Sequence, residues 1–182
     1  MKFGKILAIV AIAATCASAA GMYAAFTAGL GAQAWTASYD DGGSATLADQ
    51  AGPAMHFGFD VGFPVKNDSA GAAAIGFGAN FWAQSIEVGN MDDTGLLMLW
   101  GPSINAKMNK FVVGVRIGTS FVIETEEGYG GSFGFGLKSY LGYQFTENWS
   151  IVLDAHYTTT KHNDYIDYDV SGLGVGVLYN AF

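Results

Sequence analysis

The stretch "GYQFTENWSIVLDAHY", from Gly142 to Tyr157, decides the fold. On both sides of the tight turn at 146–148, large apolar residues alternate with small or polar ones. Alternation with a period of two predicts a β-strand with one apolar face, and two such strands across a short turn predict an antiparallel hairpin. After the turn, the apolar face consists of Trp149, Ile151, Leu153, Ala155 and Tyr157.

The same alternation recurs along the rest of the chain. We expect eight strands, over residues 23–36, 54–65, 72–85, 96–107, 111–123, 132–145, 149–160 and 170–181. Each is long enough to cross a bilayer, which takes about 9 to 11 residues of a tilted strand. Longer connections are expected at 37–53, 86–95, 124–131 and 161–169, and tight turns at 66–71, 108–110 and 146–148. Long and short connections that alternate predict an all-β, up-and-down antiparallel barrel with its long loops at one end.

The composition agrees with a membrane protein that crosses the bilayer with strands. Of the 182 residues, 51% are hydrophobic, 14% are aromatic and only 13% are charged, whereas soluble domains contain about 25% charged residues. After residue 20, no apolar run approaches the roughly 18 residues of a membrane helix. Apolar residues that never form a continuous run are typical of alternating strands.

The distribution of charge predicts which strand face lies inside. Bulky apolar residues occupy one face of the strands, and the other face combines many of the 26 glycines with a few charges such as Asp60, Arg116 and Lys138. A soluble barrel of the lipocalin type would have to enclose the bulky face, and an eight-stranded interior is only just wide enough for ordinary side chains. We therefore predict that the apolar face meets lipid and that glycines line a narrow interior.

Aromatic residues near the strand ends predict the two membrane–water interfaces. Tyr and Trp favour this depth because their rings are apolar while their polar atoms reach water. We expect an aromatic girdle formed by Tyr143, Phe145 and Trp149 near the short turns and by Trp100 and Tyr157 toward the long loops.

Residues 1–19 have the pattern of a cleaved signal peptide. Lys2 and Lys5 precede an apolar segment at 6–14, and Ala17-Ser18-Ala19 fits a cleavage site. Residues 20–182 would then form a single barrel domain. A lipoprotein signal ending at Cys16 is the alternative, although the residues before this cysteine fit it poorly. Cleavage after Ala19 removes the only cysteine, so we expect an exported protein without disulfides.

At this point the sequence resembles the small eight-stranded outer-membrane barrels of the OmpA transmembrane domain and OmpX type. The resemblance rests on the strand count, on the hairpin at 142–157, and on the last strand "GLGVGVLYNAF", which ends in Phe182. It implies a monomer in the bacterial outer membrane, surrounded by lipid and lipopolysaccharide, without enzymatic activity. It also implies insertion by the barrel-assembly machinery, with Tyr179 and Phe182 as the assembly signal. One departure is that Tyr179 and Phe182 are out of phase, which a bulge near Asn180 and Ala181 would correct.

Two functions are open for the barrel interior. Charges removed from water are tolerated when they are paired, so we expect a polar network that plugs the lumen. The alternative is a narrow channel for small or hydrophobic solutes. The expected luminal residues are Asp60, Lys107, Arg116, Glu124, Lys138, Asp154 and His156.

Two further patterns could carry chemistry. Asp154-x-His156-x-Thr158 places a base beside a hydroxyl, which acyl transfer requires. It distantly resembles the His-x-Ser of outer-membrane lipid A deacylases, which makes a lipid A-modifying enzyme a second alternative. The alternation along this strand places these three side chains on the inward face, however, so we expect them to form hydrogen bonds in the lumen. His56 and Asp60 share one strand face, and two ligands are too few for a metal site. We therefore expect no catalytic residues, no metal and no cofactor.

Acidic residues gather in the expected long connections and account for the net charge of −8. Such a charge disfavours nucleic acid as a partner. It is compatible with loops that are simply solvated, with divalent cations that bridge the carboxylates, or with a basic or glycan surface ligand held by tyrosines such as Tyr39 and Tyr165. The acidic residues in and beside these connections are Asp40, Asp41, Asp49, Glu87, Asp92, Asp93, Glu124, Glu126, Glu127, Asp164, Asp167 and Asp169.

Overall fold

The computed structural model describes residues 21–39, 46–68, 71–88, 91–124, 132–161 and 166–181. The predicted signal peptide and Phe182 lie outside these residues. The described residues form eight strands: β1 Tyr23–Tyr39, β2 Thr46–Asp68, β3 Gly71–Val88, β4 Met91–Met108, β5 Phe111–Glu124, β6 Ser132–Gln144, β7 Trp149–Lys161 and β8 Ile166–Ala181. In the part of the chain that is described, no helix is long and apolar enough to span a membrane.

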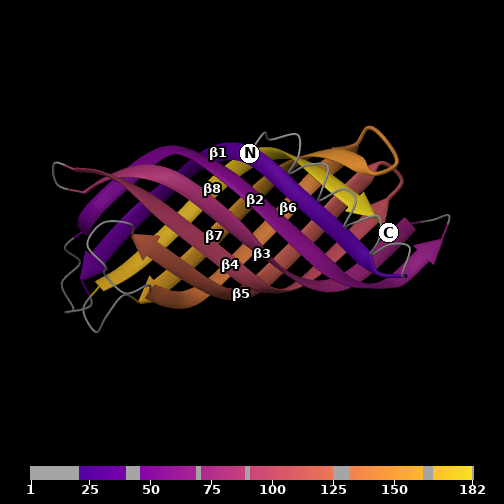
Figure 1. Cartoon of the computed structure of the whole chain (residues 1–182), viewed down its shortest axis with the longest axis horizontal. Coiled ribbons are helices and arrows are strands. Elements are labelled where there is room, and N and C mark those ends of the chain that lie inside the picture. The colour runs from indigo at the N-terminus through magenta and orange to yellow at the C-terminus, as the bar shows by residue number, and fades with distance from the viewer. Residues whose placement is uncertain are drawn as a thin grey trace, which may run out of the picture.

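The eight strands form one closed barrel in chain order. Each strand pairs with its neighbours in sequence in antiparallel register, and β8 closes the barrel against β1 from Ala24–Ala181 to Tyr39–Ile166. Figure 1 shows this closure: β8 (yellow) runs beside β1 (indigo), and the strands are tilted relative to the long axis of the barrel. The predicted fold is confirmed.

Several strands extend beyond their predicted ends. β2 begins at Thr46, inside the expected long connection 37–53. β3 continues to Val88 and β4 already begins at Met91, and these two residues pair with each other. The long connection predicted at 86–95 is therefore wrong, because most of it is paired strand. In these extensions the backbone pairing continues, while the apolar alternation by which a strand is recognised in the sequence is absent.

The two faces of the strands have the predicted orientation. In β7, exposed and buried residues alternate along the strand. Leu153 is 66% exposed, whereas its neighbours Val152 and Asp154 are buried. The outward face of the barrel consists mainly of exposed apolar side chains, among them Met55, Phe63, Ile75, Phe133, Leu141, Ile151 and Leu173. An apolar surface this large on the outside of a closed barrel fits lipid rather than water.

The end of β8 differs from expectation. Its pairing with β1 is regular through Phe26–Tyr179, Ala25–Asn180 and Ala24–Ala181, so the predicted bulge near Asn180 is absent as far as Ala181. Tyr179 shares the outward alternation of Val177 but is buried. Its ring packs edge-on against Trp149 at 5.0 Å between centroids, because the two residues are opposite each other in the β7–β8 register.

The outward face gives a first prediction. Leu153→Arg should destabilise the barrel in lipid vesicles by about 2 to 4 kcal/mol, because a charge would then face hydrocarbon near the middle of β7. The control is Asn148→Arg in the exposed β6–β7 turn, with an expected change within about 0.5 kcal/mol. Denaturant unfolding in vesicles measures both. Equal stabilities for the two variants would show that this face is in water.

Candidate functional site

The barrel interior is arranged in layers along its axis. Near the loop end, an apolar cluster fills it with Trp35, Trp82, Leu97, Leu99, Val122 and Val170. Near the turn end, a second apolar cluster contains Tyr23, Ala25, Ala74, Val112, Val152 and Leu178. Between the two clusters lie the buried charged groups. Each layer draws on many strands because inward residues at one height come from all sides of a barrel.

The first polar group is centred on Arg116 of β5. One guanidinium nitrogen, Nη2, lies 2.5 Å from Oδ1 of Asp60 on β2 and donates to the carbonyl of Phe59 at 3.1 Å. The other, Nη1, donates to the side-chain oxygen of Asn80 on β3. The Arg116 side chain is 3% exposed, so its charge is stabilised by these partners and by little water.

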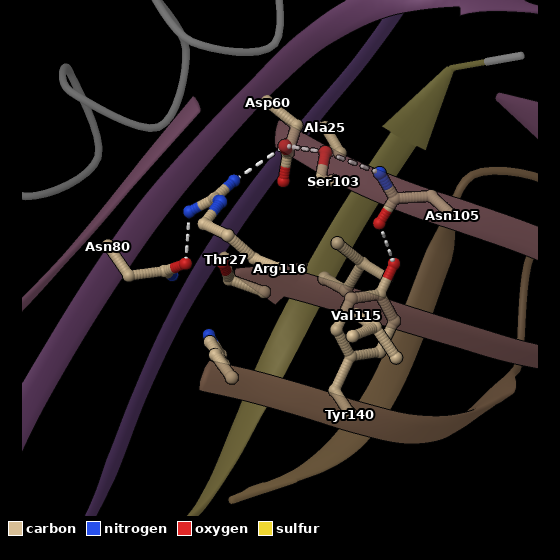
Figure 2. Close-up of a pocket in the computed structure, with 11 residues that line it drawn as sticks. Ala25, Thr27, Asp60, Asn80, Ser103, Asn105, Val115, Arg116 and Tyr140 are labelled. Atoms are coloured by element: carbon tan, nitrogen blue, oxygen red, sulfur yellow. Dashed lines mark hydrogen bonds and ion pairs between the residues drawn. The ribbon is translucent and has the colours of Figure 1, made fainter. Parts of the chain in front are cut away.

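Neutral residues extend this group around the barrel wall. Ser103 donates to Oδ1 of Asp60 at 2.5 Å, and the amide of Asn105 donates to Ser103 at 3.2 Å. The hydroxyl of Tyr140 on β6 then donates to Asn105 at 2.8 Å. Figure 2 shows the continuous chain from Asn80 through Arg116 and Asp60 to Tyr140. It links five strands, β2 to β6, by side-chain contacts within the lumen.

Glycines provide the space for these large groups. A Cβ atom on Gly78 would lie 2.7 Å from Nη2 of Arg116, and one on Gly114 would lie 2.5 Å from Oδ1 of Asn105. Both distances are too short for non-bonded contacts. The glycine-rich inner face therefore admits the polar side chains of neighbouring strands.

The second polar group draws on β1, β2, β3, β6 and β7. Nε2 of His56 is 3.1 Å from Oδ2 of Asp154, and both side chains are 1% exposed. The side-chain amide of Gln33 donates to Nε2 of His156 at 2.8 Å. The imidazole of His156 stacks on Trp82 with 4.2 Å between ring centroids. On the same indole, Nζ of Lys138 lies 5.5 Å from the centroid, within the range of a cation–π interaction.

The remaining predicted luminal residues lie elsewhere. Lys107 has the inward register but sits at the turn end of the barrel, where its Nζ is 3.4 Å from the carbonyl oxygen of Glu147. It is therefore outside both polar groups. Glu124 is the last residue of β5, and its side chain lies outside the described residues.

The acyl-transfer pattern does not assemble as a site. Asp154 faces His56 rather than His156, and the nitrogen Nε2 of His156 is bound to Gln33. Thr158 is fully buried. The metal pattern separates too, because His56 meets Asp154 while Asp60 meets Arg116. Within the described residues, no three His, Cys, Asp or Glu side chains could together hold a metal.

Sequence reasoning missed the neutral members of both groups. Asn80, Ser103, Asn105 and Gln33 are buried and hydrogen-bonded. Each occupies an inward position of its strand, so the alternation that located the charged residues could also have located these. Their partners could not be read, because a contact across the lumen depends on the tilt and stagger of all the strands.

The residues predicted for the aromatic girdle lie on the outer wall. Trp100, Tyr143, Phe145 and Tyr157 are exposed, and Trp149 is partly covered by its contact with Tyr179. Tyr157 also donates its hydroxyl to Asp169 at 3.0 Å. This contact places the Tyr157 hydroxyl and the Asp169 carboxylate together at the loop end of the outer wall.

The interior contains little free volume. The cavity beside Asp60, Arg116 and Tyr140 measures about 10 Å³, enough for about one water molecule. The space among Gln33, Trp82 and His156 has essentially no free volume. The polar middle of the lumen is therefore packed.

The chain was compared with known proteins. No protein-family model and no curated protein matches it at the level of sequence. Among solved structures, Neisserial surface protein A is similar with a TM-score of 0.55 and 15% identity, over 89% of this chain and 97% of that one. The chain has the fold of the small outer-membrane β-barrels.

Two further barrels align over most of their length with lower scores. Ail of Yersinia pestis has a TM-score of 0.46 and 13% identity, over 86% of this chain and 98% of that one. OprG of Pseudomonas aeruginosa has a TM-score of 0.42 and 10% identity, over 88% and 95%. At these identities the likeness concerns the fold alone.

The Arg116–Asp60 pair gives a second prediction. Arg116→Met should lower the free energy of unfolding by about 3 kcal/mol, because it leaves the Asp60 carboxylate in the lumen without its counter-charge. In the double variant with Asp60→Asn, much of this loss should be recovered. Denaturant unfolding in detergent micelles measures both.

Lys66→Met provides the matched control. Its ion pair with Asp68, at 3.6 Å, is about half exposed, so the loss should stay below about 1 kcal/mol. Equal losses for Lys66→Met and Arg116→Met would contradict a structural role for the luminal pair.

Proposed function

We propose that the chain is an integral bacterial outer-membrane barrel with a closed lumen and a structural or surface-interaction role. The observation that carries this proposal is the packed interior, in which two apolar clusters enclose a polar middle with room for about one water molecule. Support for the membrane setting comes from the exposed apolar outer wall. The fold shared with other outer-membrane barrels is consistent with it.

The layered interior argues against conduction. An ion in transit needs water or polar groups along the whole path, because its desolvation is costly. Trp82, Leu97 and Leu99 at the loop end and Val112 and Val152 at the turn end are all buried, and these apolar side chains occupy the lumen at two levels. A channel would require these side chains to move aside.

The same interior argues against the enzymatic alternative. A deacylase acting on a membrane lipid needs its base and nucleophile within reach of the lipid. His156 and Thr158 are buried in the lumen, on the opposite strand face from the exposed Leu153 and Tyr157. Catalysis on lipid A is therefore not part of this proposal.

The surface role rests on the acidic loop end. Five of its twelve acidic residues lie outside the described residues, and five more lie in strands whose side chains there are not described. Of the other two, Asp167 lies 3.9 Å from Lys161, and Asp169 accepts a hydrogen bond from Tyr157. Lys161 is the only lysine or arginine in the predicted loop segments, so the chain itself offsets little of the negative charge there. Divalent cations, or a cationic surface ligand, would supply a counter-charge.

A closed lumen gives a third prediction. Purified protein inserted in planar bilayers should show no stable conductance steps, while a general porin treated identically should show them. The reason is that two apolar layers interrupt any aqueous path. Regular single-channel currents that scale with the amount of folded protein would overturn the proposal.

The acidic loops give a fourth prediction. In whole cells, calcium should slow proteolysis of the loops and EDTA should reverse the effect, because bound cations hold neighbouring carboxylates together. Asp164→Asn with Asp167→Asn should weaken this protection, whereas Asp68→Asn at the opposite end should leave it unchanged. Cleavage rates that are insensitive to EDTA would count against a cation role.

A further inference from the structure

A polar vestibule opens at the turn end of the barrel. It has a volume of about 450 Å³, within the range of small-molecule sites. It is lined by the ends of the three short turns and of β8: Asn67, Asp68, Gly71, Ala72, Lys107, Asn109, Glu147, Asn148 and Asn180. The polar groups inside the lumen do not contribute to this site, so it is a separate feature of the fold.

One side chain in the vestibule has an unused polar atom. Asn180 is 3% exposed, and its Oδ1 accepts no hydrogen bond from the described residues. It follows Leu178 on the inward alternation of β8, so its side chain points into the mouth of the barrel. A buried carbonyl oxygen without a donor costs free energy, and a ligand with an N–H group would satisfy it.

The charges of the vestibule select the class of ligand. Lys107 contributes an ammonium, which approaches the Glu147 carbonyl at 3.4 Å. Glu147 contributes an exposed carboxylate. Asp68 is already engaged by Lys66 and by the backbone N–H of Gly71. One cationic and one anionic group therefore remain for a ligand that carries both charges.

The amides of the vestibule match a peptide backbone. Asn67, Asn109, Asn148 and Asn180 each combine donors with an acceptor, as the peptide group does. The ammonium of Lys107 disfavours a metal ion. No aromatic ring is among the lining residues, so a sugar would find no stacking surface. We propose that the vestibule binds short peptides with free ends, with Lys107 on the carboxylate and Glu147 on the ammonium.

The proposed orientation in the outer membrane, on which this inference rests, places the vestibule in the periplasm. The apolar cluster around Val112 and Leu178 separates it from the lumen. A bound peptide would therefore be held at this mouth rather than transported. The site would act as a periplasmic receptor for peptide ends.

Titration of the mature barrel in detergent micelles with trialanine tests the proposal. Trialanine should bind, and amidation of its C-terminus or acetylation of its N-terminus should each weaken binding by about tenfold or more, the effect of losing one charge-assisted hydrogen bond. In Lys107→Gln, amidation should no longer matter. In Glu147→Gln, acetylation should no longer matter. Asn180→Ala should weaken binding of all three peptides.

Lys110→Gln is the matched control. Its side chain lies over the Tyr143 ring on the outer wall, so binding should be unchanged. Absence of binding, equal binding of doubly capped trialanine, or binding of calcium or a neutral disaccharide in its place would overturn the proposal. Heat-modifiable migration on gels and outer-membrane fractionation report separately on the folded, inserted barrel, so failure of the peptide site is distinguishable from failure of the proposed membrane setting.

Discussion

The constraint on which this structure depends is that hydrocarbon offers no hydrogen bonds to a peptide backbone. A strand in lipid must pair along both edges, and the pairing of β8 with β1 leaves no edge free in the described barrel. Closure with eight strands then fixes the width of the interior. The outer apolar face and the glycine-rich inner face both follow from this geometry, since one side meets lipid and the other has little room.

Limited room and buried charge together explain the composition of the lumen. Arg116 and Asp154 could not be accommodated next to ordinary side chains, and Gly78 and Gly174 leave space beside them. Once inside, each charged group needs a partner, and the partners come from other strands. The polar middle therefore ties together strands that are already paired through their backbones.

The sequence predicted the strands and their faces because alternation with a period of two survives wherever one face meets lipid. It failed in residues 46–53 and around Val88, where strand pairing continues without an apolar alternation. It also found the charged luminal residues but not their contacts. Asp154 and His156 are two apart on β7, yet Asp154 meets His56 of β2. Such contacts depend on strand tilt and stagger, which no local pattern records.

The β1–β8 junction joins the two ends of the described chain, and Ala24 pairs with Ala181 there. Contacts between residues so distant in sequence form slowly, because a long loop must close before they are made. The barrel cannot be completed until the last strand is available. Any compact intermediate before that moment exposes two unpaired edges, which makes it prone to aggregate. The risk of aggregation therefore lasts until the final strand has paired with the first.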